Sequence, residues 1–217
     1  MTSVWVIVVA AGAGSRFGAR KQYEALGDRR VLDWSLSAAR TVADGIVMAV
    51  PPDCAGVEEA GVDVIVPGGA RRSDSVRQAL AAIPVTADVI VVHDAARPLA
   101  SPSLFAAVVA ALDDADGAVP GLQLADTVKR VRDGQVIDTL DRAELVAVQT
   151  PQAFRAGVFR RAHATGADAT DDAALVEAMG GCVVVVPGEP ANTKLTSAGD
   201  LDQAREHAAR HQSPRAG

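Results

Sequence analysis

Five short and nearly unbroken runs of valine and isoleucine constrain the fold of this chain more than any other sequence feature. They lie at residues 4–9, 45–50, 62–66, 88–92 and 182–186. A strand with one face in water alternates apolar and polar residues, whereas a strand buried on both faces of a parallel sheet does not. We therefore expect these segments to form the parallel strands of a buried sheet.

Alanine- and leucine-rich segments with helical spacing separate these runs, at residues 31–43, 72–82, 101–115, 155–164, 171–179 and 198–211. Several of them begin at residues that commonly cap a helix, namely Ser101, Thr170 and Ser197. Strands and helices that alternate along a chain pack as a mostly parallel sheet with helices on both faces. The sequence thus predicts a doubly wound α/β fold.

One segment departs from this alternation. From residue 122 to about residue 145, short apolar and polar residues alternate around Asp133-Gly134, which is a strong signal for a β-hairpin. Two isolated strands are marginally stable in water, so we expect this ribbon to pack on another body, and a second subunit is the natural candidate. We find no repeat or linker, and expect residues 1–217 to form a single domain with a protruding β-ribbon arm.

Charge and cysteine content narrow the function classes. The chain has 21 basic and 27 acidic residues, a net charge of −6, which disfavours non-specific nucleic-acid binding. Cys54 and Cys182 form neither a CxxC motif nor a Cys/His cluster, so we expect two buried, reduced thiols rather than a disulfide or a zinc site. No segment approaches the ~18 apolar residues of a membrane span. We expect a soluble, cytoplasmic protein that binds neither membrane nor nucleic acid.

Ligands of open parallel sheets bind at the carboxyl ends of the strands, so the turn after each strand is the first place to look for chemistry. The first turn reads AAGAGSRFGARKQ from Ala10 to Gln22. Its small residues allow backbone N–H groups to approach a phosphate, and Arg16 and Lys21 add positive charge. The segment is neither a G-x-G-x-x-G motif nor a P-loop. A phosphate-binding loop and a tight turn with surface cations remain equally good interpretations.

Two later turns offer further candidates. After residue 66 the chain reads PGGARRSDS, where we expect Ser73 or Ser75 to cap a helix and the glycine pair to admit a planar ligand. After residue 92 it reads HDAARP. Asp94 is placed either to hold a magnesium ion that bridges phosphates or to cap a turn. We expect His93 to be a hydrogen-bonded structural residue, and Arg97 to form a surface ion pair or to bind an anion.

The order of motifs along the chain is more specific than any one of them. The series AAGxGxR…KQ, GG…R.DSV, HDAARP, DTVK, DR, TPQ.F, TDDA and N.K.T resembles the 2-C-methyl-D-erythritol 4-phosphate cytidylyltransferases from Val4 to about Ala209. The resemblance implies a Rossmann-like nucleotidyltransferase of the non-mevalonate isoprenoid pathway. Such an enzyme joins CTP and 2-C-methyl-D-erythritol 4-phosphate, with magnesium, to give the CDP-linked alcohol and pyrophosphate. It also implies a homodimer whose arms reach across to the neighbouring subunit.

The resemblance also assigns roles by motif. Arg16 and Lys21 resemble the pair that stabilises the pentacoordinate transition state. Arg142 and Lys194 resemble the pair that positions the substrate phosphate, with Arg142 contributed in trans. The family usually has proline where this chain has Arg20, and that proline would fix the local backbone before Lys21.

The remaining assignments concern the two substrates. The positions that match CTP-binding residues are Ala10, Ala11, Gly12, Ala13, Gly14, Gly69, Ser75, Asp94 and Ala95, and Asp94 is also the metal position. The positions that match the methylerythritol phosphate site are Arg97, Thr127, Arg142, Thr150 and Lys194.

The physics of the reaction agrees with this assignment. A phosphate monoester has a second pKa near ~6, so it is largely ionised at neutral pH and needs no general base. The chain offers cations, glycine amides and one carboxylate rather than a Ser/His/Asp set. A ribitol-5-phosphate cytidylyltransferase is a weaker alternative, because those enzymes tend to carry AGG and HDSVRP. A non-catalytic nucleotide-binding domain is a second alternative, against which all four expected cations are present.

Overall fold

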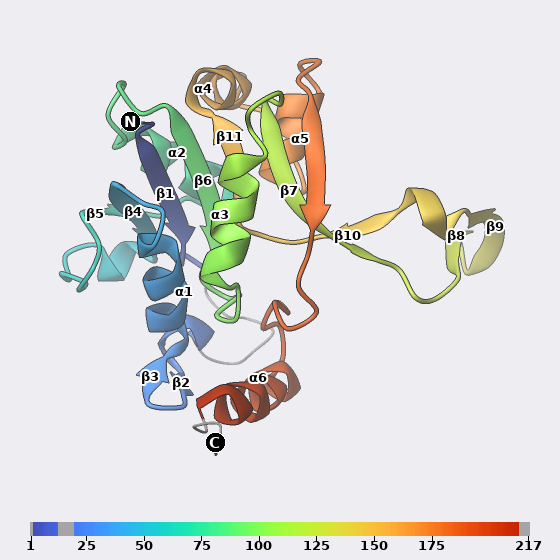
Figure 1. Ribbon diagram of the computed structural model, residues 1–217, viewed down its shortest axis with the longest axis horizontal. Helices are drawn as coiled ribbons and strands as arrows, with labels where there is room; N and C mark the ends of the chain where they lie inside the picture. The colour runs from blue at the N-terminus through green and yellow to red at the C-terminus, as the bar shows by residue number, and fades with distance from the viewer. Residues whose placement is uncertain (1, 13–19, 213–217) are drawn as a thin grey trace.

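A mixed β-sheet forms the centre of the protein (Figure 1), which we describe from a computed structural model for residues 2–12 and 20–212. In these residues the sheet has eight strands. In spatial order they are β10 (Val146–Val148), β7 (Gly117–Gln123), β11 (Gln152–Arg155), β6 (Val89–Asp94), β1 (Val4–Val9), β4 (Gly45–Val50) and β5 (Val64–Pro67), and β12 (Val183–Pro187) pairs with β7.

The valine-rich runs form the parallel part of this sheet, as predicted. β6, β1, β4 and β5 are parallel neighbours, and every residue of β4 and β6 is buried. The third run begins two residues later than expected, at Val64. β12 is also parallel, but it pairs with β7 at the other side of the sheet.

Three strands of the sheet were not predicted. β7 contains two glycines and a proline, residues that are typical of turns and that weaken a strand signal. β10 and β11 have only three and four residues, too few for a period to be recognised. β11 runs antiparallel between β6 and β7 and joins the two halves of the sheet.

Helices cover both faces, which confirms the doubly wound α/β class. One apolar cluster packs α1 (Val31–Arg40) and α3 (Pro102–Ala110) on the sheet, with Phe105 among its fully buried members. A second cluster packs α2 (Arg72–Ala81), α4 (Ala156–Ala164) and α5 (Asp172–Glu177) on the opposite face. Ser101 caps α3 as expected, because its hydroxyl accepts from the Leu104 N–H. α5 is capped by Asp171 rather than by Thr170.

A third apolar cluster joins the two ends of the chain. α6 (Ala198–Gln212) packs through Leu201 and Ala204 against Leu26 and Leu195. Leu26 belongs to a small hairpin of β2 (Ala25–Leu26) and β3 (Arg29–Arg30), which follows the short 3-10 helix η1 (Lys21–Tyr23). The segments that carry the two predicted phosphate-site lysines are therefore fixed to one another.

The predicted ribbon forms an arm that projects away from the sheet (Figure 1). It consists of β8 (Val128–Arg132) and β9 (Gln135–Leu140), and the short helix η3 (Arg142–Glu144) follows. Asp133 and Gly134 both have positive φ, the conformation that a tight hairpin turn requires. The apolar side chains of Val131, Val136 and Ile137 are 56%, 60% and 48% exposed.

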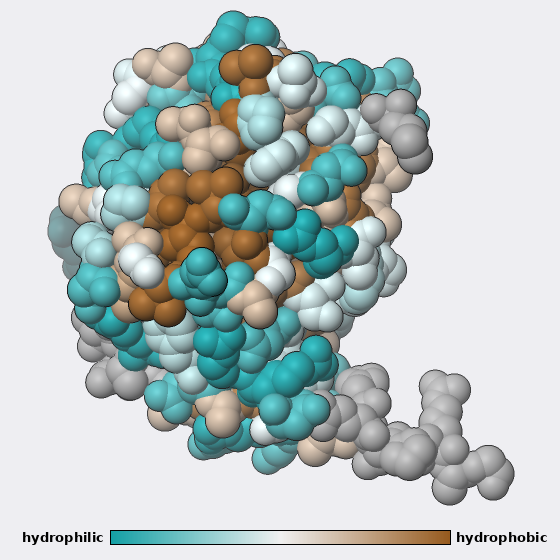
Figure 2. Space-filling view, turned by 90° about the vertical axis from the view of Figure 1, so that its left-hand side faces the viewer, coloured by the Kyte–Doolittle hydropathy of each residue, from teal (hydrophilic) through white to brown (hydrophobic). Residues whose placement is uncertain are grey.

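β5 forms one edge of the sheet. Figure 2 faces the β5 side and shows a hydrophobic patch surrounded by hydrophilic residues at the level of this strand.

Cys54, in the short helix η2 (Pro52–Cys54), is half-buried and Cys182 is exposed. The prediction that both thiols are buried is therefore wrong, although both are free. None of the described helices has the length and hydropathy that a membrane span requires.

Candidate active site

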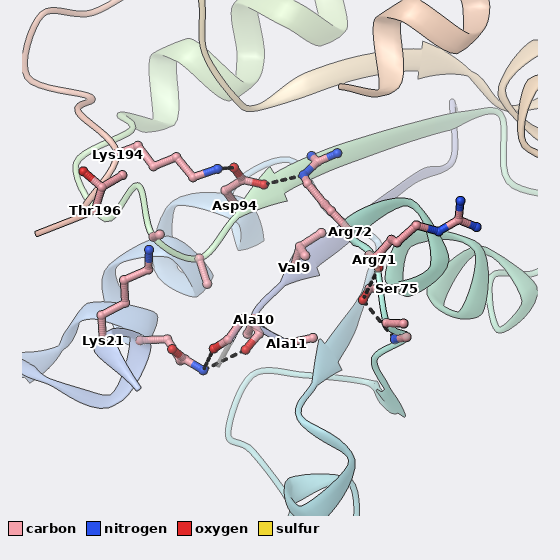
Figure 3. A pocket seen from close by; sticks show the side chains of 16 residues that line it. Val9, Ala10, Ala11, Lys21, Arg71, Arg72, Ser75, Asp94, Lys194 and Thr196 are labelled. Carbon is pink, nitrogen blue, oxygen red and sulfur yellow. Dashed lines mark hydrogen bonds and ion pairs between the residues drawn. The ribbon is translucent and has the colours of Figure 1, made fainter. Parts of the chain in front are cut away.

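A cavity of about 450 Å³ opens at the carboxyl ends of the parallel strands. Residues from β1, the turn before α2, the end of β6 and the segment before α6 line it (Figure 3). The predicted site residues that the structure brings together here are Ala10, Ala11, Gly12, Lys21, Gly69, Ser75, Asp94, Ala95 and Lys194. Ala13, Gly14 and Arg16 lie outside the described residues.

The start of the first turn is held by a buried glutamine that the sequence did not single out as functional. Gln22 is 3% exposed, and its side-chain N–H groups donate to the carbonyl oxygens of Ala10 at 2.8 Å and Gly12 at 3.4 Å. The Nζ of the neighbouring Lys21 donates to the carbonyl of Leu195 at 2.6 Å. These contacts place Lys21 at the mouth of the cavity and link it to the segment that carries Lys194.

The glycine pair of the second turn allows close approach of the backbone. A Cβ atom at Gly68 would lie 2.2 Å from the Cβ of Ala11, and one at Gly69 would lie 2.3 Å from the Cβ of Asp74. Glycine is therefore required at both positions. The hydroxyl of Ser75 accepts from the Gly69 N–H at 3.0 Å and shapes this turn.

The expectation that Ser73 or Ser75 caps α2 is wrong. The N-cap is Arg71, whose backbone N–H donates to the Asp74 carboxylate at 3.2 Å. Ser73 instead donates to Asp168 at 2.6 Å. Asp74 forms the cap interaction from the third helical position, which leaves the Ser75 hydroxyl available to the glycine turn.

Asp94 is the last residue of β6, and its carboxylate forms ion pairs with two basic side chains at the cavity. Its Oδ2 accepts from Lys194 Nζ at 2.6 Å and its Oδ1 accepts from Arg72 Nε at 3.0 Å (Figure 3). Burial alone raises the pKa of a carboxyl group, but the charges of Arg72 and Lys194 outweigh it and hold the pKa of Asp94 well below its usual range. Asp94 is therefore ionised at neutral pH.

His93 lies behind Asp94 and is a structural residue, as expected. It is fully buried; its Nε2 lies 3.2 Å from the carbonyl oxygen of Arg97 and its Nδ1 lies 3.1 Å from the hydroxyl of Thr150. Burial lowers the pKa of His93 to about 4. The same hydroxyl accepts from the backbone N–H of Asp94 at 3.0 Å, so Thr150 helps to fix the end of β6.

The remaining predicted substrate residues are not gathered in the cavity. Arg97 donates to the carbonyl of Asn192 at 2.8 Å rather than forming an ion pair at the surface. Thr127 and Arg142 lie at the base of the arm, where both are exposed and Arg142 donates to the carbonyl of Ala125. Within one chain these two residues are therefore separated from the cavity.

The donor set of the cavity suits phosphate chemistry. It combines lysine and arginine side chains with glycine-rich turns and with Asp94, the one carboxylate among the described residues that line the cavity. Magnesium in phosphate sites is commonly held by one or two carboxylates and by the phosphates themselves, so Asp94 fits this metal. No cluster of three His, Cys, Asp or Glu residues that could hold a metal occurs in the described ranges.

Comparison with known proteins decides the family. A family model described as "IspD: 2-C-methyl-D-erythritol 4-phosphate cytidylyltransferase" matches residues 4–209. The chain belongs to this family. The match covers all parts of the cavity and the arm, so the IspD family relation extends over the whole candidate site.

Individual IspD relatives agree with the family match. The chain is 43% identical to a bifunctional enzyme IspD/IspF of Nitratidesulfovibrio vulgaris over 91% of its own length, but it spans only 56% of that relative. It is 40% identical to the 2-C-methyl-D-erythritol 4-phosphate cytidylyltransferase of Syntrophotalea carbinolica, with 92% and 93% of the two chains covered. The crystal structure of 2-C-methyl-D-erythritol 4-phosphate cytidylyltransferase from Thermus thermophilus superposes with a TM-score of 0.81 at 36% identity, covering 96% of this chain and 100% of that one.

Proposed function

We propose that the chain transfers a cytidylyl group from CTP to 2-C-methyl-D-erythritol 4-phosphate, giving 4-diphosphocytidyl-2-C-methyl-D-erythritol and pyrophosphate in the non-mevalonate isoprenoid pathway. The observation that carries the proposal is the cavity that unites Lys21, Asp94 and Lys194 with two glycine-rich turns in a chain of the IspD family. Lysine amines and backbone N–H groups stabilise charge that develops on phosphates.

The reaction needs alignment and charge neutralisation rather than a general base. The attacking phosphate monoester is largely ionised at neutral pH, and it would be positioned by Lys194 and by Arg142. Lys21, together with Arg16, would stabilise the charge on the α-phosphate as the bond to pyrophosphate breaks. A magnesium ion at Asp94 would neutralise charge on the CTP phosphates.

The separation of Arg142 from the cavity supports a dimeric active site. We propose that the arm of one subunit, with its exposed Val131, Val136 and Ile137, packs on a second subunit and delivers Arg142 and Thr127 to the partner cavity. A two-stranded ribbon with apolar side chains in water gains stability from such packing. We infer that residues 1–217 act as one nucleotidyltransferase domain in this dimer.

We also propose that the protein is cytoplasmic. Both cysteines are free, and Cys182 is exposed. Exposed free thiols are most compatible with a reducing compartment. The substrates of the proposed reaction are small water-soluble phosphates, and the acidic net charge of −6 argues against nucleic acid as an additional partner.

The choice of alcohol is the point to test. Pyrophosphate release would be measured with CTP, magnesium and either 2-C-methyl-D-erythritol 4-phosphate or ribitol 5-phosphate. We expect faster release with the methylerythritol substrate. Faster turnover with ribitol 5-phosphate would assign the ribitol reaction instead. Binding of CTP without release of pyrophosphate from CTP in the presence of either alcohol would indicate a non-catalytic nucleotide-binding domain.

A further inference from the structure

The carboxylate of Asp94 is connected through the half-buried Arg72 to a line of buried polar side chains that leads away from the cavity. Arg72, the first residue of α2, donates through Nε to Asp94 Oδ1 at 3.0 Å and through Nη1 to Asp172 Oδ2 at 2.7 Å. The side chain of Asp172 is 1% exposed, and Asp172 does not line the cavity. Arg72 is therefore held between a carboxylate at the site and a carboxylate behind it.

Asp172 has a buried histidine on its other side. It is the first residue of α5, and its Oδ1 lies 3.2 Å from Nε2 of His163 on α4. The His163 ring is also buried, and its centroid lies 4.3 Å from that of Phe159. Three helices on one face of the sheet thus contribute one member each to the line. Within it, the hydrogen bonds to Asp94 and Asp172 fix the guanidinium of Arg72 relative to the end of β6.

The electrostatics of this line depend on both carboxylates. Burial by itself lowers the pKa of Arg72, but the charges of Asp94 and Asp172 outweigh burial and raise it. Arg72 therefore carries a full charge although its side chain is only 27% exposed. With its two donors directed at two carboxylates, the planar guanidinium has one preferred orientation. Loss of the Asp172 charge would remove the ion pair that holds Arg72 on the side away from Asp94.

The consequence for the site lies in how the carboxylate of Asp94 is oriented. Arg72 contacts Oδ1, while Oδ2 is directed toward Lys194 (Figure 3). Groups that orient a metal-binding side chain from behind typically influence metal affinity by about 10- to 100-fold. We propose that Asp172, acting through Arg72, is a positioning residue that orients Asp94 for magnesium, an inference that rests on the proposed function.

Direct binding measurements separate this role from a merely structural one. CTP affinity of the purified protein would be measured by calorimetry in EDTA and at increasing magnesium, for the wild type and for Asp172→Asn. Arg72→Lys keeps the positive charge but lacks the planar guanidinium that bridges the two carboxylates. This variant replaces Asp172→Asn in the measurement if Asp172→Asn does not fold. Thermal unfolding would report the stability of each variant.

A matched control removes a comparable arginine–carboxylate pair elsewhere. Glu59, whose side chain is 12% exposed, pairs with Arg30 at 2.5 Å, and neither residue lines the cavity. Glu59→Gln should lower the unfolding temperature without changing the magnesium dependence of CTP binding. The control therefore shows how much of any effect follows from lost stability alone.

For Asp172→Asn we expect unchanged CTP affinity in EDTA. Magnesium should still enhance CTP binding, but the concentration that gives half of this enhancement should rise by about tenfold or more. A folded Asp172→Asn protein with wild-type magnesium dependence would overturn the inference. If magnesium has no effect on CTP binding by the wild type, the proposed metal site itself is wrong. The two failures are thus distinguished by the wild-type measurement.

Discussion

At the residue scale, few side chains of the site act alone. Lys194 contacts Asp94, and Lys21 contacts the backbone of the residue after Lys194. Of the three lysines in the sequence, these two are at the cavity and Lys129 is on the arm. A lysine amine is a compact, mobile charge, which suits a residue that must follow a reacting phosphate.

Replacement of Lys21 by alanine should lower kcat by about 100-fold, equivalent to roughly 3 kcal/mol of transition-state stabilisation. CTP affinity should change far less, because the charge is needed mainly when the α-phosphate becomes pentacoordinate. Steady-state kinetics and calorimetry would separate the two effects. Lys129→Ala, which removes an exposed lysine bonded to Thr139, is the control. An unchanged kcat in Lys21→Ala would remove this residue from the transition state.

His93 should make the folded protein sensitive to mild acid. Burial lowers its pKa from 6.5 to about 4, and the charged groups that act on it are Asp94, Arg97 and Arg72. Below its unfolded pKa of 6.5 the unfolded chain takes up a proton that the folded protein excludes, so stability should fall as the pH drops toward 4. The expected loss is up to about 3 kcal/mol.

Urea unfolding at several pH values would test this expectation. His93→Gln removes the titrating group, and the fall in stability between pH 6.5 and 4 should become shallower in this variant. The pKa of Asp94 is depressed, so its contribution is lost mainly below its ordinary value of 3.8, outside most of that window. Parallel profiles for the wild type and the variant would show that His93 is not the cause.

At the element scale, the arm is the feature whose purpose is not evident within one chain. Its strands pair only with one another among the described strands, and three of its apolar side chains are about half exposed or more. Because they belong to none of the apolar clusters formed by the described residues, a charge placed there should affect association rather than folding. The arm therefore offers two separate tests, of assembly and of shared active sites.

Ile137→Asp should convert a dimer into a monomer and abolish most of the activity. The unfolding temperature should fall only by the amount that loss of the dimer explains. Light scattering after size-exclusion chromatography would report the mass. Val57→Asp is the matched control, since Val57 is 64% exposed but lies outside the arm. An Ile137→Asp protein that remained an active dimer would contradict the role of the arm.

Mixed dimers test whether Arg142 acts in trans. Arg142→Ala and Lys194→Ala homodimers should both be nearly inactive. A mixed dimer of the two variants would contain one site with Lys194 from one subunit and Arg142 from the other, so activity should return on mixing. Activity would be assayed after the subunits are exchanged and the mixed species is isolated. Failure of isolated mixed dimers to recover activity would indicate that the two residues do not share a site across subunits.

At the scale of the whole molecule, the sequence predicts what local patterns encode. The valine runs of β1, β4 and β6 and the Asp133-Gly134 turn were recognisable because period and turn chemistry are local. β7, with Pro120 and two glycines, was not. The turns after β1, β5 and β6 could be named in advance because parallel strands end at one edge, whereas Lys194 was assigned only through the family resemblance.

Tertiary contacts account for the features that the sequence did not predict. Arg72 and Asp172 are 100 positions apart, and nothing in either motif indicates that they meet behind Asp94. Gln22 likewise looks like an ordinary polar residue until the fold buries it against the Ala10 carbonyl. The link between Lys21 and Leu195 also joins opposite ends of the chain.

Every role proposed for the cavity depends on its joining CTP to a methylerythritol phosphate. Phosphorus NMR of the wild-type protein with CTP, magnesium and 2-C-methyl-D-erythritol 4-phosphate is the decisive experiment, because substrates and products are resolved together. We predict that CTP is consumed only when the alcohol phosphate is present, with pyrophosphate and the CDP-linked alcohol formed in equal amounts. Persistence of both substrates, or hydrolysis of CTP without formation of a CDP-linked product, would show that the cavity does not perform this reaction.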